Sequence, residues 1–134
     1  MTVLSNRPSL RAGMVGMGMI FDETYRPFFE RVHREGLFDH RFGAIDVPLT
    51  AVASRTGLRA DAYRQVAGSK IGPFASFSGE YSVEQLVYAA PDFACVATPD
   101  NRHFDAAKRL LEAGIHVLIE KPSVLSLGDR KSVV

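Results

Sequence analysis

The sequence predicts an α/β protein with a doubly wound parallel sheet and helices on both faces of that sheet. Two observations lead to this prediction. Short apolar runs alternate with helix-like stretches along the whole 134-residue chain, which is the order of parallel strands joined by helices. One run, residues 93–97, is apolar without interruption, as expected for a strand covered on both faces. The length predicts one domain over residues 12–134, preceded by an N-terminal tail over 1–11.

The first half of the chain contains four of the predicted elements. An apolar run over residues 12–16 predicts the first strand. Residues 20–35 are expected to form a helix, because apolar side chains recur there at intervals of three and four. Residues 43–48 fit neither pattern. A second strand over 49–54 and a short helix over 60–67 follow.

The second half repeats the alternation. A weak strand is expected over residues 74–77, followed by a helix that begins at Ser82 with Gln85 completing a capping box and ends before Pro91. The later elements are a strand over 93–97, a helix capped by Asp100 or Asn101 and ended by Gly114, a strand over 115–119, a turn over 120–122 and the start of a helix near Ser126.

Composition excludes several classes of function. The formal net charge is +1, which gives no reason to expect nucleic acid or an anionic membrane as partner. No apolar run reaches the length of about 18 residues that a membrane span needs. The chain has one cysteine, Cys95, so no internal disulfide can form. With no apolar stretch of signal-peptide length near the N-terminus, we expect a cytoplasmic protein.

A glycine pair follows the first predicted strand. Gly16 would allow a tight turn, and Gly18 would let the backbone approach a pyrophosphate that rests on the start of the next helix. This arrangement is typical of a Rossmann-type sheet. The third glycine of the usual pattern is replaced by Phe21, which predicts a wider gap between helix and strand or a shifted helix start. The alternative is an ordinary strand–turn–helix glycine pair.

The end of the second predicted strand lacks the acidic residue that usually accepts from the ribose hydroxyls of NAD. Ser54 and Arg55 stand there, with Arg59 nearby. A hydroxyl and a guanidinium would bind a 2′-phosphate, so the sequence favours NADP over NAD. The alternative is that both arginines are solvated surface residues.

Two further polar segments follow the fourth and fifth predicted strands. Thr98 and Pro99 open a turn that leads to His103, which taken alone is more typical of a helix surface than of catalysis. Lys121 follows the fifth strand, where a lysine can donate to a substrate hydroxyl or to the nicotinamide ribose. A solvent-exposed strand end is the alternative for a single lysine.

Together these motifs resemble one family. The stretch CVATPDNRHFDAAKRLLEAGIHVLIEKP, residues 95–122, resembles the glucose–fructose oxidoreductase, inositol dehydrogenase and MocA family, and GMVGMGMI resembles its glycine loop. The resemblance implies a domain that binds NAD or NADP, and hydride transfer to or from a CH–OH carbon of a sugar or cyclitol. It implies Lys121 as the catalytic residue. The implied cofactor contacts are Gly16, Met17, Gly18, Met19 and Ile20 at the pyrophosphate, and Thr98, Pro99, Asn101, His103, Glu120 and Lys121 at the nicotinamide half. Ser54 and Arg55, which the end of the second strand predicts, add the contacts at the other ribose.

The resemblance also implies a second domain that holds the substrate and often forms oligomers. The sequence ends at Val134, before a sixth strand and before that domain, so we expect the isolated chain to be inactive. One alternative is a non-enzymatic module that binds NADP(H). Another is a related domain for a different nucleotide or a methyl donor, against which Lys121 argues.

Overall fold

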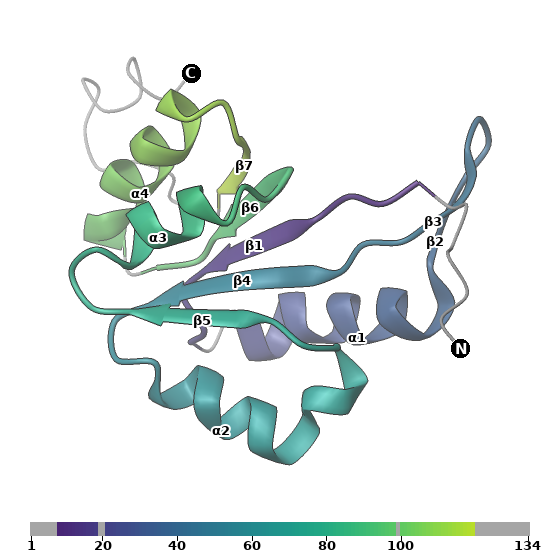
Figure 1. Ribbon diagram of the computed structural model, residues 1–134, viewed down its shortest axis with the longest axis horizontal. Coiled ribbons are helices and arrows are strands. Elements are labelled where there is room, and N and C mark those ends of the chain that lie inside the picture. Colours follow the sequence, from purple (N-terminus) through teal and green to yellow (C-terminus); the bar gives the residue numbers. More distant parts are fainter. Residues whose placement is uncertain (1–7, 19–20, 99, 120–134) are drawn as a thin grey trace.

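Five parallel strands form the central sheet, in the order β5-β4-β1-β6-β7 (Figure 1). The computed structural model describes residues 8–18, 21–98 and 100–119, and the side chains of residues 100–103 lie outside that description. The strands are β1 (Ala12–Val15), β4 (Leu49–Ser54), β5 (Ala75–Ser78), β6 (Phe93–Val96) and β7 (His116–Ile119). Every pairing between neighbours in this sheet is parallel. The predicted Rossmann-type α/β fold is confirmed.

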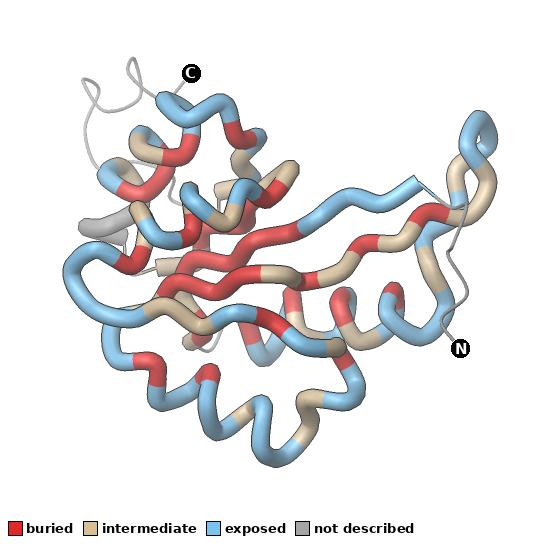
Figure 2. Tube along the Cα trace, viewed as in Figure 1, coloured by how far each residue is buried: buried red, intermediate tan, exposed pale blue. Residues whose placement is uncertain are grey.

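Side chains of the three central strands alternate between two separate cores. Met14, Val52 and Cys95 belong to one buried cluster. Their neighbours along the same strands belong to the other, as Val15 and Val96 illustrate. This alternation follows from the two-residue period of a strand. The red segments of Figure 2 show that both clusters centre on β1, β4 and β6.

Helices cover both faces of the sheet. In Figure 1, α1 and α2 lie on one face, and α3 and α4 lie on the other. Their bounds are α1 (Arg26–Glu35), preceded by a π-helical turn η1 (Phe21–Tyr25), α2 (Leu58–Ala67), continued by a 3-10 turn η2 (Gly68–Lys70), α3 (Ser82–Tyr88) and α4 (Asp100–Glu112). The buried side of α1 carries Phe29 and Val32, which are two of the apolar residues that predicted this helix.

A two-stranded antiparallel hairpin lies between α1 and β4, in the region that the sequence left open. Its strands are β2 (Leu37–Asp39) and β3 (Gly43–Ile45). Asp39 holds the turn, because its Oδ1 accepts from the backbone N–H of Arg41 at 2.7 Å. Strands of three residues are too short to show a period of two. The hairpin projects beyond the amino ends of the sheet strands (Figure 1).

The capping box predicted at the start of α3 is wrong. The helix begins at Ser82 as expected, but Tyr81 is its N-cap residue and no side chain caps it. Ser82 is buried, at 6% exposure, and therefore lies one position inside the helix. The turn over 120–122 and the helix near Ser126 lie outside the described residues. No helix within the described residues is long and apolar enough to cross a membrane.

Candidate functional site

The carboxyl ends of the sheet strands surround an open cavity with a volume of about 890 Å³. The carboxyl ends of parallel strands are the usual ligand edge of such a sheet. Segments that follow β1, β4, β5 and β6 line it, including Gly16, Met17, Gly18, Ser54, Arg55, Thr56, Arg59, Glu80 and Thr98. Five of the residues predicted at the pyrophosphate and the ribose (Gly16, Met17, Gly18, Ser54 and Arg55), and Thr98, are therefore brought together at one site.

Gly16 occupies a position that only glycine can fill. Its φ angle is +94°, and a Cβ atom there would lie 2.6 Å from the carbonyl oxygen of Ala97. The turn is held between its neighbouring strands, because Gly16 N–H donates to Ala53 O at 2.8 Å and Ala97 N–H donates to Val15 O at 2.8 Å. The predicted tight turn after β1 is thus confined by backbone on both sides.

Gly18 stands in a contrasting environment. A Cβ atom built on Gly18 would meet nothing within 4 Å, so its backbone faces open space at the cavity. Met17, between the two glycines, is buried at 5% exposure and anchors the loop in the core. The loop therefore presents backbone to the cavity and side chain to the core. Met19 and Ile20 lie outside the described residues.

Phe21, at the place of the third glycine, begins a widened helical turn. Residues Phe21–Tyr25 form the π-helical turn η1, and the regular helix α1 begins only at Arg26. The Phe21 side chain is 1% exposed. A π turn is wider than an α turn, which makes room for a ring where a glycine usually permits close packing. The predicted shift in helix start is what the structure shows.

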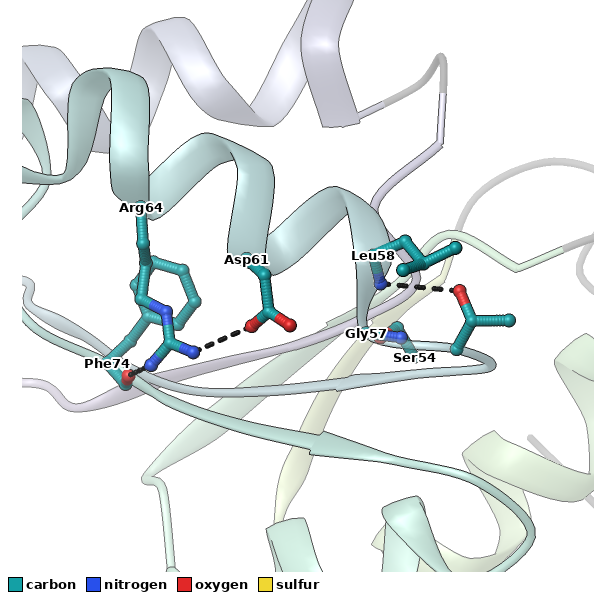
Figure 3. Close-up of polar contacts among 7 residues, drawn as sticks. Ser54, Gly57, Leu58, Asp61, Arg64 and Phe74 are labelled. Carbon is teal, nitrogen blue, oxygen red and sulfur yellow. Dashed lines mark hydrogen bonds and ion pairs between the residues drawn. The ribbon is translucent and has the colours of Figure 1, made fainter.

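The loop after β4 is held by its own side chains. Ser54 Oγ accepts from Gly57 N–H at 3.1 Å, and Thr56 Oγ1 accepts from Leu58 N–H at 3.3 Å (Figure 3). Gly79, after β5, donates its N–H to the carbonyl of Arg55 at 3.0 Å. The N–H groups of Gly57 and Leu58, at the start of α2, therefore already have side-chain acceptors, and side-chain cations would bind an anion at this point.

Two such cations are present. Arg55 and Arg59 are exposed and line the cavity, and no ion pair joins either of them to another residue in the described ranges. By contrast, Arg64, which lies on α2 as Arg59 does, pairs with Asp61 at 2.7 Å and donates to the carbonyl of Phe74 at 3.2 Å (Figure 3). The guanidinium groups at the cavity are thus available to a ligand, whereas Arg64 holds α2 to the segment before β5.

Thr98 carries a buried hydroxyl at the end of β6. Its Oγ1 atom has no hydrogen-bond partner within the described part of the chain. A buried polar group without a partner costs about 1 to 3 kcal/mol. Thr98 is among the residues that line the cavity, and a polar ligand that reached its hydroxyl would satisfy it.

The rest of the predicted nicotinamide half is not tested by the structure. Pro99, Glu120 and Lys121 lie outside the described residues, as do the side chains of Asn101 and His103. The backbone of residues 101–103 lies in the first turn of α4.

The cavity also has two acidic residues that the sequence analysis did not single out. Glu80 follows β5 and lies at the same edge, so the strand-end rule applied to a third strand could have found it. Asp105 lies on α4, and no local signal marks it. No group of three metal-binding side chains occurs among the described residues.

A comparison with family models identifies the family of the chain. A family model described as GFO_IDH_MocA, "Oxidoreductase family, NAD-binding Rossmann fold", matches residues 10–134. No curated protein sequence matches the chain.

Solved structures show the same fold. The WlbA dehydrogenase from Bordetella pertussis in complex with NADH and UDP-GlcNAcA is 23% identical, with a TM-score of 0.70 over 94% of this chain and 33% of that one. KijD10, a 3-ketoreductase from Actinomadura kijaniata in complex with TDP-benzene and NADP, is 24% identical, with a TM-score of 0.69 over 95% and 34%. A dehydrogenase (MviM) from Clostridium difficile is 18% identical, with a TM-score of 0.69 over 93% and 34%. The chain spans about a third of the length of these proteins.

Proposed function

Since this chain belongs to the GFO_IDH_MocA oxidoreductase family with its NAD-binding Rossmann fold, we propose that it is the cofactor domain of an enzyme that transfers hydride between NADP(H) and a sugar or cyclitol. The observation that carries the proposal is the cavity at the carboxyl edge of the sheet, where the glycine loop and the free arginines meet. The residues present fit a dinucleotide, because they offer backbone, cations and an unsatisfied hydroxyl in one place.

The glycine loop would hold the pyrophosphate. Gly18 leaves its backbone open to the cavity, and the helix that follows supplies a positive end to its dipole. The proposed pyrophosphate contacts are residues 16–20, including Met19 and Ile20. Because the π turn η1 moves the start of α1 to Arg26, the opening turn rather than the regular helix meets the phosphates.

The loop after β4 would select the cofactor. No carboxylate ends β4, whose last residue is Ser54, followed by Arg55. A 2′-phosphate carries a charge near −2 that a guanidinium binds with a fork of two hydrogen bonds. Ser54 and Thr56 already accept from the N–H groups of Gly57 and Leu58, and the exposed cations Arg55 and Arg59 would bind this charge. We therefore assign NADP as the preferred cofactor.

The nicotinamide would lie toward the ends of β6 and β7. Thr98 would offer its unsatisfied hydroxyl to the nicotinamide end, and Pro99, Asn101, His103 and Glu120 would complete this half. NADP(H), when bound, supplies or accepts the hydride. Lys121 would hold the substrate oxygen and pass its proton, which is the role of a positioned general acid or base.

The substrate itself would be bound largely outside these 134 residues. The chain spans about a third of the structures it matches, and two of those hold nucleotide-linked ligands, UDP-GlcNAcA and TDP-benzene. We place the substrate contacts and any homo-oligomer interface in a second domain. Without such a domain the chain would bind the cofactor but turn over no sugar, because nothing orients the substrate or excludes water.

Calorimetric titration with NADPH and NADH tests the proposal. We expect NADPH to bind more tightly, and Arg55→Ala to weaken NADPH about tenfold while leaving NADH nearly unchanged, because one charge-assisted bond is lost. Arg41→Ala is the matched control, since Arg41 is also an exposed arginine and lies in the turn of the β2–β3 hairpin. Equal effects of Arg55→Ala on both dinucleotides, or a preference for NADH, would overturn the NADP assignment. No binding of either would overturn the function.

A further inference from the structure

A set of contacts between α1 and α2 lies directly behind the glycine loop. It begins at Phe21, the residue that ends the loop. The Phe21 ring meets the ring of Tyr63 on α2 edge to face, with 5.9 Å between ring centroids and an interplanar angle of 85°. Edge-to-face pairs are a favoured aromatic geometry. The end of the glycine loop is thus braced on α2 as well as on the sheet.

The contacts continue from Tyr63 back to the opening turn of α1. The Tyr63 hydroxyl donates to Glu30 Oε2. Arg26 Nη1 donates to Glu30 Oε1 at 3.2 Å, and Arg26 Nε lies 4.0 Å from Asp22 Oδ1 within η1. The Glu30 side chain is only 16% exposed, so water screens these interactions weakly. These contacts therefore begin and end in the same turn, η1.

The hydroxyl of Tyr63 keeps its proton over the working pH range. Burial, together with the hydrogen bond to Glu30 and its negative charge, raises the pKa of Tyr63 well above its usual value. The group is therefore a permanent donor to Glu30 near neutral pH, and the link between α1 and α2 does not switch with pH there.

The same helix connects this link to the other half of the cavity. α2 begins at Leu58, immediately after the loop of Ser54, Arg55 and Gly57. Tyr63 therefore lies on the helix that follows the Arg55 loop, with one contact to the end of the glycine loop and one to α1.

From this geometry we propose that Tyr63, with Glu30, is a positioning residue that fixes the distance between the glycine loop and the Arg55 loop. One dinucleotide would then span both loops without rearrangement. The proposal rests on the proposed function and deepens it: Phe21 and Tyr63 would do the work that the third glycine does where it is present.

The test compares two probes on the 134-residue chain and on Tyr63→Phe. The variant keeps the ring beside Phe21 and removes only the hydroxyl that binds Glu30. NADPH spans both loops, whereas adenosine 2′-monophosphate lacks the pyrophosphate and needs only the Arg55 loop. We expect Tyr63→Phe to weaken NADPH about fivefold, the effect of one lost hydrogen bond, and to change the affinity for adenosine 2′-monophosphate by less than about twofold. The Glu30→Gln variant should likewise weaken the binding of NADPH more than that of adenosine 2′-monophosphate. The double variant should bind NADPH no more weakly than the weaker-binding of the two single variants.

Asp61→Asn is the control on the same helix, since it removes the negative charge from the 2.7 Å pair with Arg64 (Figure 3) and leaves Tyr63 in place. It should leave the ratio of the two affinities unchanged. The inference is overturned if Tyr63→Phe leaves NADPH binding intact, or if it weakens both probes equally, which would show a general loss of structure. Failure of the unmodified chain to bind NADPH would instead overturn the proposed function.

Discussion

The two helices beside the proposed cofactor site, α1 and α2, begin in different ways. The start of α2 is held by neighbours in the sequence, because Ser54 and Thr56 accept from amides two or three residues ahead. The start of α1 is held from far away by Tyr63, whose ring meets Phe21 and whose hydroxyl donates to Glu30 on α1. Both turns line or support the same cavity. The difference shows that one half of the site is built by local chemistry and the other half by packing between helices.

The largest expected effect comes from removing the ring at the start of α1. Phe21→Ala should lower the free energy of unfolding by about 3 to 4 kcal/mol, because it leaves a cavity at a fully buried position. Urea unfolding measures the loss. Phe28→Ala is the control on the same helix, since Phe28 is 40% exposed and should cost less than about 1 kcal/mol. Similar losses for the two variants would mean that Phe21 does not anchor the turn.

A smaller effect should follow from adding one methyl group to the glycine loop. Gly16→Ala combines a positive φ angle with a contact of 2.6 Å to Ala97 O, so we expect a loss of about 2 to 3 kcal/mol. Gly114→Ala separates the two causes. Gly114 has a similar φ of +79° but open space around it, so it should cost only about 1 kcal/mol. Thermal unfolding of both variants would contradict the account if the losses were equal.

The local half of the site should tolerate change better. Ser54→Ala removes the acceptor for Gly57 N–H and should destabilise the chain by about 1 kcal/mol. Ser69→Ala is the control, an exposed serine for which the described chain offers no hydrogen-bond partner. A loss at Ser54 as large as that of Phe21→Ala, in the same urea titration, would erase the distinction between the two turns.

The smallest expected effect is a difference in alkaline stability. The pKa of Tyr63 is raised in the folded chain, so the folded state holds this proton more tightly than the unfolded state, whose tyrosine titrates near 10. The stabilisation is fully present below that pH and is lost as the pH rises above it. Unfolding free energies at pH 9 and about pH 11 should therefore fall more steeply for the unmodified chain than for Tyr63→Phe. Parallel profiles would contradict the role of this hydroxyl.

The same division explains what the sequence could predict. Alternating apolar runs give the strands and most of the helices, because those patterns are local. Ser54, Arg55 and Gly16 stand at strand ends, where topology alone brings them to one edge. The π turn at Phe21 could be expected only as a departure from the glycine pattern.

Other features could not be predicted from any short stretch of the sequence. The link between Tyr63 and Glu30 joins residues 33 positions apart, and the hairpin strands are three residues each. Ser82 matches the capping-box pattern, yet it is buried within α3, and Tyr81 is the N-cap residue.

The most direct measurement is an NMR titration of the isotopically labelled chain with NADPH, in which each backbone amide reports on its own surroundings. The account predicts that the amides which shift are those of residues 16–18, 54–57 and 97–98, from both turns at once, while the hairpin over residues 37–45 stays unchanged. Shifts confined to one turn would contradict the idea that a single dinucleotide spans both. Shifts centred on the hairpin, or none at all, would contradict the site itself.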